Sequence, residues 1–300
     1  MSNKKREIYK DLDISNWKVY KGQDLTNNEY HGEKEHSSSS NLKDLIKVKQ
    51  GRFDKELWGR EKYYQEKILG NRGEQKSSNA FDEGSLAHNM ILEPEMFDTD
   101  FSIYSGFRKA GNDFKAFKAA EEAGLNRTIL SKAQYKRVES WVAAYRLNPT
   151  AVEMIAKCET EYSLFGEIDG VKIKVRADAI DVENGIIADV KTSGKAIDLE
   201  NWKYTVEDFE YQLSGALYAR LFSMYYGKPF RFYFICLGKQ DKDCEIYRLG
   251  DEKHREGDLQ VNKALKVYKE CKESGLWINP KKEEAKKVVK TYDNYTILDC

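Results

Sequence analysis

The segment from Glu159 to Ser193 constrains the fold more than any other part of this chain. It contains three β-type runs, TEYSLFGEI, VKIKVRADAIDV and GIIADVKTS. The dipeptides Asp169-Gly170 and Asn184-Gly185 separate these runs, and both dipeptides are strong signals for tight hairpin turns. The pattern therefore predicts an antiparallel three-stranded meander.

The two turns also predict which side chains share a face of the sheet. With two-residue turns, counting back along the strands places Glu161 and Lys191 opposite Asp178, and Asp189 diagonal to it. Acidic groups this close repel one another, so a positive charge is expected among them. Lys191 can supply that charge, and so can a hard divalent ion, which prefers carboxylate oxygens. A solvated face with ordinary cross-strand ion pairs explains the same pattern and stays open at this point.

Helical patterns lie on both sides of the meander. The patterns before the meander predict a helix that starts near Ser40 and a second helix over residues 79–93, stopped by Pro94. They also predict one or two helices over residues 112–147, with a break near Gly124 and an end at Pro149. Those after the meander predict a helix, a buried strand and a long helix, over residues 206–226, 230–238 and 251–275. The order predicts a mixed α/β (α+β) fold, with a central mixed sheet flanked by helices.

A chain of 300 residues suits one large domain. We expect that domain over residues 37–280, with a helical part at 37–150, the meander at 159–193 and a helix-strand-helix part at 206–275. A polar segment, 1–36, precedes it, with a short strand around Trp17 to Tyr20, and a tail, 281–300, follows it.

Composition excludes several classes of protein. Lys and Arg total 50 and Asp and Glu total 50, so a surface for nucleic acid must be a local patch. No run of about 18 apolar residues suggests a membrane span, and the sequence predicts a cytoplasmic protein. The chain has five cysteines: Cys158, Cys236, Cys244, Cys271 and Cys300. They include no C-x-x-C pair, which favours reduced thiols over disulfides or a zinc site.

The sequence RADAID, followed eleven residues later by DVKTS, resembles the D…(D/E)-x-K signature of the PD-(D/E)xK nuclease superfamily. More narrowly, the chain resembles phage exonucleases of the exonuclease VIII (RecE-like) group and RecB-type nuclease domains. The resemblance covers roughly residues 28 to 235. It also includes the segments EYHGEKEHSSSSNLKDLI, GSLAHNMILEPEMF and EYQLSGALYARLF. It implies a restriction-endonuclease-like core.

The resemblance assigns roles to individual residues. It implies that His88, Asp178, Asp189 and the carbonyl of Val190 bind metal, and that Glu161 is the first-strand acid. Mg²⁺ is the expected ion, with Mn²⁺ as a substitute.

The resemblance also makes Lys191 the motif lysine. It would orient or deprotonate the attacking water, or stabilise the charge of the transition state. Both roles stay open at this point.

Four further residues are predicted to bind substrate. Tyr211 and Gln212 resemble a Tyr/Gln pair expected near the substrate, although family members tend to space the two apart. Lys174 and Arg176 occupy the same strand face as Asp178 and would form a track for backbone phosphates, unless that face is merely solvated.

The expected function is a Mg²⁺-dependent exodeoxyribonuclease that digests linear double-stranded DNA from 5′ ends, in the cytoplasm of a bacterial host. Its expected partners are DNA ends, a single-strand annealing protein and further copies of the chain in a ring. One alternative is a catalytically silent DNA-binding or assembly protein with the same fold. Another is a nuclease of the Cas4 or AddB type without the iron–sulfur cluster, because Cys236 and Cys244 are too few and too far apart to hold one.

Overall fold

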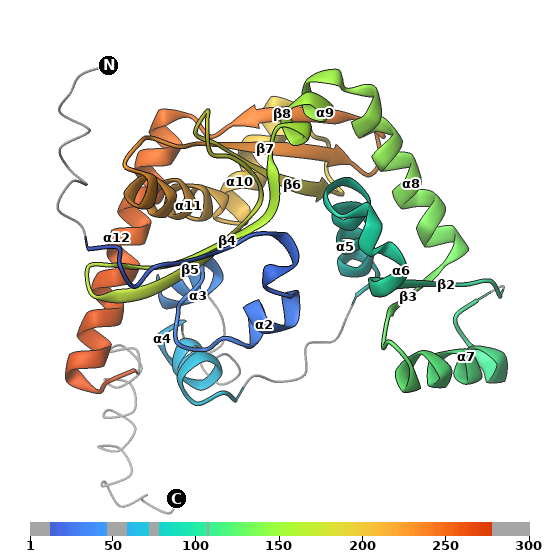
Figure 1. Ribbon diagram of the computed structural model, residues 1–300, viewed down its shortest axis with the longest axis horizontal. Helices are drawn as coiled ribbons and strands as arrows, with labels where there is room; N and C mark the ends of the chain where they lie inside the picture. The colour runs from blue at the N-terminus through green and yellow to red at the C-terminus, as the bar shows by residue number, and fades with distance from the viewer. Residues whose placement is uncertain (1–12, 47–58, 72–77, 107, 278–300) are drawn as a thin grey trace, which may run out of the picture.

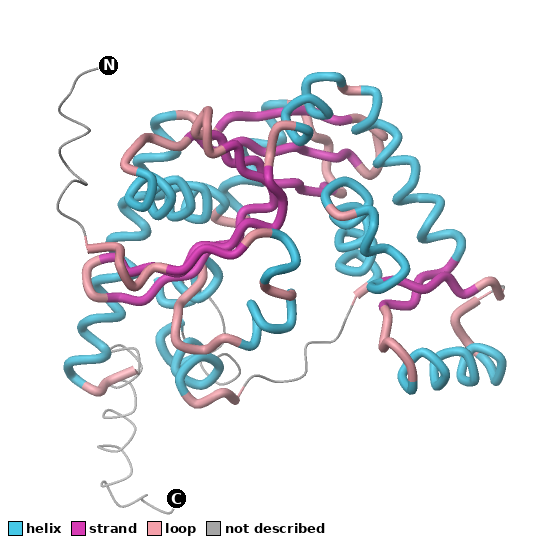
Figure 2. Tube along the Cα trace, viewed as in Figure 1, coloured by secondary structure: helices cyan, strands magenta, loops and turns pink. Residues whose placement is uncertain are grey.

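A computed structural model describes residues 13–46, 59–71, 78–106 and 108–277 of the chain. The predicted tail at 281–300 lies outside the described residues. The central element is a six-stranded sheet in which only β6 and β7 run parallel (Figures 1 and 2). Its strands, in spatial order, are β1 (Lys18–Tyr20), β4 (Glu159–Ile168), β5 (Val171–Asp181), β6 (Ile186–Ser193), β7 (Arg231–Gly238) and β8 (Cys244–Arg248). The predicted mixed sheet and its antiparallel meander, β4 to β6, are confirmed.

The first turn of the meander is the predicted two-residue turn. Asp169 and Gly170 both have positive φ angles, 51° and 80°, as the tightest hairpin turn requires. Ile168 therefore pairs with Val171, and the predicted register of β4 against β5 is confirmed.

The predicted register of β5 against β6 is wrong. The Asp181 carboxylate accepts hydrogen bonds from the backbone N–H of Asn184 at 2.9 Å and from its side-chain amide at 2.7 Å. These bonds close a four-residue loop, residues 182–185, in place of the predicted two-residue turn. Ala179 pairs with Ala188, so Asp178 lies across from Asp189 and not from Lys191. Because the shift is two residues, all three side chains keep the predicted face.

Helices cover both faces of the sheet (Figure 1). On one face, α10 (Leu199–Asp208) and α11 (Tyr211–Tyr226) connect β6 to the parallel strand β7, and α12 (Asp251–Ser274) packs against α11. The sequence predicted one helix over 206–226, but Glu210 adopts a left-handed conformation, with φ at 52°, and divides it. The core on this face includes Leu213, Leu217 and Phe234.

The other face carries α5 (Asn79–Leu92), α8 (Lys132–Leu147) and α9 (Pro149–Ala156). The predicted end of α5 before Pro94 is confirmed. Pro149 does more than close α8: it begins α9, and the Asn148 side chain caps that helix by accepting from the N–H of Ala151 at 3.1 Å.

A small second sheet lies beyond α5 and α8. Its two parallel strands, β2 (Phe101–Tyr104) and β3 (Thr128–Ser131), are joined through α7 (Gly111–Ala123), and the predicted break near Gly124 ends α7. The sequence did not predict these strands. The remaining short elements are η1 (Gly22–Asp24), α2 (Asn27–Gly32), α3 (Ser39–Ile46), α4 (Gly59–Tyr63), η2 (Tyr64–Ile68), η3 (Pro94–Met96) and α6 (Phe97–Asp100). No helix in the described part of the chain is long and apolar enough to cross a membrane.

Candidate active site

The two acids of the motif face each other where β5 and β6 separate. Backbone pairing ends at Ala179 and Ala188, which are the chain neighbours of Asp178 on β5 and of Asp189 on β6. The Asp178 carboxylate accepts a hydrogen bond of 2.7 Å from the backbone N–H of Val190, so its side chain bridges the strands beyond the last pair. Both acidic side chains are mostly buried, with exposed fractions of 13%.

His88 connects α5 to the acids of the meander. Its Nε2 lies 2.5 Å from Asp178 Oδ2, and its Nδ1 lies 3.5 Å from Glu161 Oε1. Glu161 has a left-handed backbone, with φ at 48°, which is unfavourable for a residue with a Cβ and frequent at functional sites. The second oxygen of Glu161 lies 3.7 Å from the Arg176 guanidinium.

Lys191 neutralises the second acid. Its Nζ lies 2.5 Å from Asp189 Oδ2 and 3.5 Å from the carbonyl oxygen of Val190. The ammonium also lies 5.6 Å from the centre of the Tyr211 ring, in a cation–π contact. The site therefore contains two cation–carboxylate pairs, one at the acid of β5 and one at the acid of β6.

These pairs and their burial shift the pKa values of the site. Burial raises the pKa of Asp189 to about 6, opposed by Lys191 and reinforced by the charge of Asp178. Burial would also raise the pKa of Asp178, but His88 and Lys191 outweigh it and lower that pKa.

The pKa values of the two cations are both raised. Burial would lower the pKa of His88, but Asp178 and Glu161 raise it to about 10. Asp189 and Asp178 likewise outweigh burial and raise the pKa of Lys191. The protein thus holds two positive side chains against its two buried acids.

The donor atoms suit a hard divalent ion. The Lys191 ammonium lies among oxygens of Asp189 and Val190, so these two oxygens already face a common positive charge. Carboxylate and carbonyl oxygens are ligands that Mg²⁺ and Mn²⁺ accept, and an imidazole suits Mn²⁺. Among the residues that the structure describes, no three His, Cys, Asp or Glu side chains are arranged as a metal-binding group.

The structure separates the two predicted substrate residues of α11. Tyr211 lies at the site and stacks on the exposed ring of Phe209, with 5.4 Å between ring centres. Gln212 is buried and its amide lies 3.4 Å from Glu256 of α12. Its side-chain oxygen is buried and has no hydrogen-bond partner among the described residues.

Tyr218 is a site residue that the sequence analysis did not select. Burial, with Asp189 and Asp178 nearby, raises the pKa of its phenol. It lies seven residues after Tyr211, which puts both rings on one side of α11. This helical spacing was visible in the sequence, but it is equally typical of core packing.

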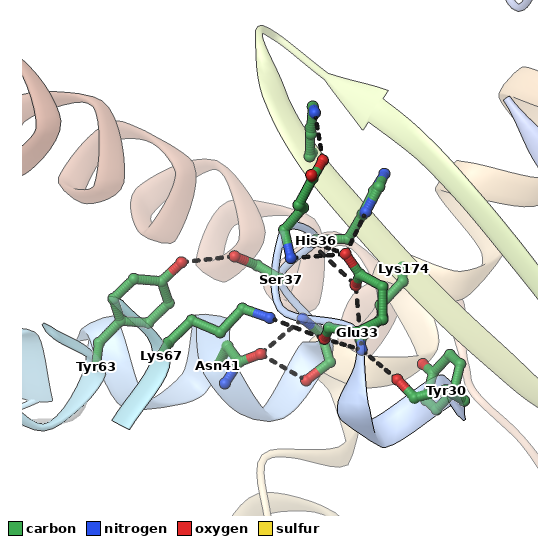
Figure 3. Close-up of polar contacts among 11 residues, drawn as sticks. Tyr30, Glu33, His36, Ser37, Asn41, Tyr63, Lys67 and Lys174 are labelled. Carbon is green, nitrogen blue, oxygen red and sulfur yellow. Dashed lines mark hydrogen bonds and ion pairs between the residues drawn. The ribbon is translucent and has the colours of Figure 1, made fainter. Parts of the chain in front are cut away.

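The other two predicted substrate residues are buried beneath the N-terminal segment. The Lys174 ammonium contacts the carbonyl of Tyr30 and donates to the carbonyl of Glu33 at 2.7 Å (Figure 3). The Arg176 guanidinium donates to Ser163, Asn27 and the carbonyl of Leu25, at 2.7, 2.8 and 2.7 Å. Protein groups therefore already occupy both cations, and substrate binding by Lys174 and Arg176 stays a prediction.

Comparisons with known proteins address the family and the fold of the chain. A family model described as a PDDEXK-like domain of unknown function (DUF3799) matches residues 38–288. This match confirms the resemblance to the PD-(D/E)xK superfamily. No curated protein gives a significant match.

Solved structures give a further comparison. A crystal structure from Eubacterium rectale, described as a proposed exonuclease, is 22% identical over 81% of this chain and 86% of its own, with a TM-score of 0.56. This likeness shows a shared fold. A phage-related exonuclease from Haemophilus somnus 129PT is 12% identical over 82% of this chain and 99% of its own, and its TM-score of 0.32 is too low to carry an argument.

Proposed function

Since the chain belongs to the DUF3799 family of PDDEXK-like domains, we propose that it is a metal-dependent nuclease that hydrolyses phosphodiester bonds of linear double-stranded DNA. The observation that carries this proposal is the pairing of Asp178 with His88 and of Asp189 with Lys191 at one point of the sheet. A purely structural ion-pair cluster does not need two buried acids opposite each other, because opposing carboxylates destabilise a strand pair.

Asp178, Asp189 and the carbonyl of Val190 would hold the divalent ion, with His88 as a further ligand. When bound, such an ion neutralises phosphate charge and lowers the pKa of water. His88 also holds the Asp178 carboxylate in place, because its ring lies between that carboxylate and Glu161.

Lys191 is the residue that we assign to the scissile phosphate. Its ammonium is fixed by Asp189 and Tyr211 and remains partly exposed, so a phosphate can approach it. A fixed positive charge in a partly dry site stabilises the negative charge that builds up as the phosphate is attacked.

The finer features of the activity are also proposals. By its resemblance to phage exonucleases, the enzyme would start at 5′ ends and use Mg²⁺, with Mn²⁺ as a substitute. It would leave 3′ single strands for an annealing protein, and a ring of several copies would help a chain of zero net charge to retain DNA.

End-labelled linear duplex and closed circular DNA, each incubated with Mg²⁺, Mn²⁺ or EDTA, test the proposal. We expect wild type to digest linear DNA only, and only with metal. Asp189→Asn and Lys191→Met should each lower the rate by at least about 10²-fold, since each removes charge stabilisation from the site. Glu167→Gln, at an exposed position near the end of β4, is the matched control and should retain activity.

Each other outcome has a defined meaning. Cleavage of closed circles would make the protein an endonuclease. Binding of DNA without cleavage in either metal would favour the silent DNA-binding alternative. Unchanged cleavage by Asp189→Asn would show that this site is not the catalytic one.

A further inference from the structure

A basic cavity lies where α5, α8 and the small sheet meet. It has a volume of about 500 Å³, and its lining includes Asn79, at the start of α5, and Lys132, at the start of α8. Figure 1 shows α8 rising from the end of β3, and α5 packs beside α8 on the same face of the large sheet. The cavity is therefore built by the layer that also carries His88.

Charge is segregated in this cavity. Its lining contains four cationic side chains and no acidic one: Arg108, Lys109, Lys132 and Arg137. The whole chain, in contrast, has equal numbers of basic and acidic residues. Such a concentration of positive charge favours an anionic ligand.

Two of the four cations are held in place by neighbouring groups. Arg137 pairs with the buried Glu83 of α5, and Lys109 donates to the carbonyl of Ile129 at 3.1 Å. Arg108 and Lys132 are exposed, and neither forms an ion pair within the described part of the chain. After Glu83 is counted, the cavity remains strongly positive, and Arg108 and Lys132 are available to a ligand.

Polar contacts also fix the two helix starts that border the cavity. The Gln134 amide donates to the Asn79 side chain at 3.3 Å, and the Gln134 oxygen accepts from the N–H of Ser131 at 3.0 Å. The positive ends of the two helix dipoles add to the attraction for an anion.

The position of the cavity relates it to the active site. Asn79 and His88 are nine residues apart on α5, a rise of about 14 Å. Phosphates of one strand of B-form DNA advance about 3.4 Å per nucleotide along the axis, so this distance corresponds to about four nucleotides. A strand whose scissile phosphate lies at the site beside His88 would therefore need about four nucleotides to reach the cavity.

We propose that this cavity is a second phosphate-binding site, which holds the substrate strand about four nucleotides from the scissile bond through Arg108 and Lys132. This inference rests on the proposed nuclease function and adds to it a contact that positions the DNA. The ligand chemistry is a phosphate of the strand, either within the backbone or at its 5′ end.

The test compares Arg108→Gln/Lys132→Gln with a matched control, Lys136→Gln/Arg146→Gln. The control removes the same charges from exposed positions of α8 that do not line the cavity. KM and kcat for linear duplex DNA are measured in the presence of Mg²⁺. The KCl concentration is varied from 50 to 300 mM, approximately the range in which phosphate contacts are salt-sensitive. Each substrate is prepared with a 5′-phosphate and with a 5′-hydroxyl, and thermal melting checks the fold.

We expect the cavity variant to raise KM about ten-fold, with kcat changed less than about two-fold, and to lower the slope of log KM against log salt by roughly two. A change with both substrates identifies backbone phosphate, and a change with the 5′-phosphate substrate alone identifies the terminal phosphate.

Two results would overturn the inference. If wild type cleaves DNA and the cavity variant has the KM and salt slope of the control, the cavity does not bind the strand and the proposed function stands. If wild type neither binds nor cleaves DNA in Mg²⁺ or Mn²⁺, the proposed function fails and this inference fails with it.

Discussion

At the residue scale, Lys191 and His88 make the acidic pair of the site tolerable. Asp178 and Asp189 are mostly buried and lie across from each other, an arrangement that is unfavourable without a counter-charge. Each acid has its own cation at 2.5 Å, so the site is electrostatically balanced as it stands. A divalent ion would provide a further positive charge, and it should matter most when one of the protein cations is absent.

This balance predicts the effect of Lys191→Met on stability. Without the ammonium, Asp189 keeps no close cation, and we expect the free energy of unfolding in EDTA to fall by about 1–3 kcal/mol. Mg²⁺ or Mn²⁺ should then raise the melting temperature of the variant more than that of wild type, because an ion that binds only the folded state stabilises it. Scanning calorimetry with and without metal measures both effects.

Lys195→Met supplies the control for this prediction. Its exposed ion pair with Asp208 lies outside the site, and its loss should change neither stability nor the response to metal. Equal metal responses in wild type and Lys191→Met would show that the ion does not bind at these carboxylates.

The strand pattern of the sequence was enough to place the two acids and the lysine of the motif together. Asp178, Asp189 and Lys191 follow from strand alternation, which a two-residue error in register does not change. The burial of Lys174 and Arg176 could not be predicted, because strand alternation does not reveal that the α2 segment packs over this face of the sheet. Tyr218 was missed because its spacing is the same for a core residue and for a site residue.

At the element scale, the loop between β5 and β6 sets the relative position of the two acids. Gly185 has φ at 63°, and a Cβ there would lie 2.5 Å from the carbonyl oxygen of Pro229. The loop is thus pressed against the chain that leads into β7, and the Gly185 carbonyl accepts from the N–H of Arg231 at 2.8 Å. A side chain at position 185 must displace one of the two segments.

Two glycine substitutions separate this contact from backbone strain. Gly185→Ala should lower the free energy of unfolding by about 2–4 kcal/mol, since it combines a left-handed backbone with a steric clash. Gly170→Ala, where φ is 80° and a Cβ would meet nothing within 4 Å, should lower it by about 1 kcal/mol. Urea unfolding measures both values, and equal losses would mean that the Pro229 contact contributes nothing.

The elements that the sequence predicted are those with a local signal. The turn at Asp169-Gly170 depends only on its own two residues, and its register was right. The turn at Asn184-Gly185 also depends on the side chain of Asp181, which accepts a hydrogen bond from the N–H of Asn184 and so favours a longer loop. The predicted register after this turn was therefore wrong. β2 and β3 have four residues each and are connected by a helix instead of a tight turn, so neither periodicity nor a turn signal predicted them.

At the scale of the whole molecule, the N-terminal segment is part of the sheet layer that carries the site. β1 pairs with β4, and the segment after α2 forms a bridge with β5, in which the N–H of Ser37 donates to the carbonyl of Lys172 at 2.9 Å. Glu33, at the end of α2, lies at the centre of this contact (Figure 3). Its carboxylate accepts from the N–H of Glu35 at 2.6 Å and lies 3.3 Å from the Lys174 ammonium.

The contact predicts a pH dependence of stability that Glu33→Gln should remove. Burial would raise the pKa of Glu33, but hydrogen bonds from His36 and Glu35 and the charge of Lys174 lower it from 4.5 to about 2. A lowered folded-state pKa stabilises the protein above the unfolded value, and that stabilisation is lost as pH falls towards 2. Relative to wild type, Glu33→Gln should therefore cost about 1–2 kcal/mol at pH 6, after allowance for partial exposure, and less at pH 3. Urea unfolding at the two pH values measures this difference, with Glu167→Gln as the exposed control, and an equal difference at both pH values would contradict it.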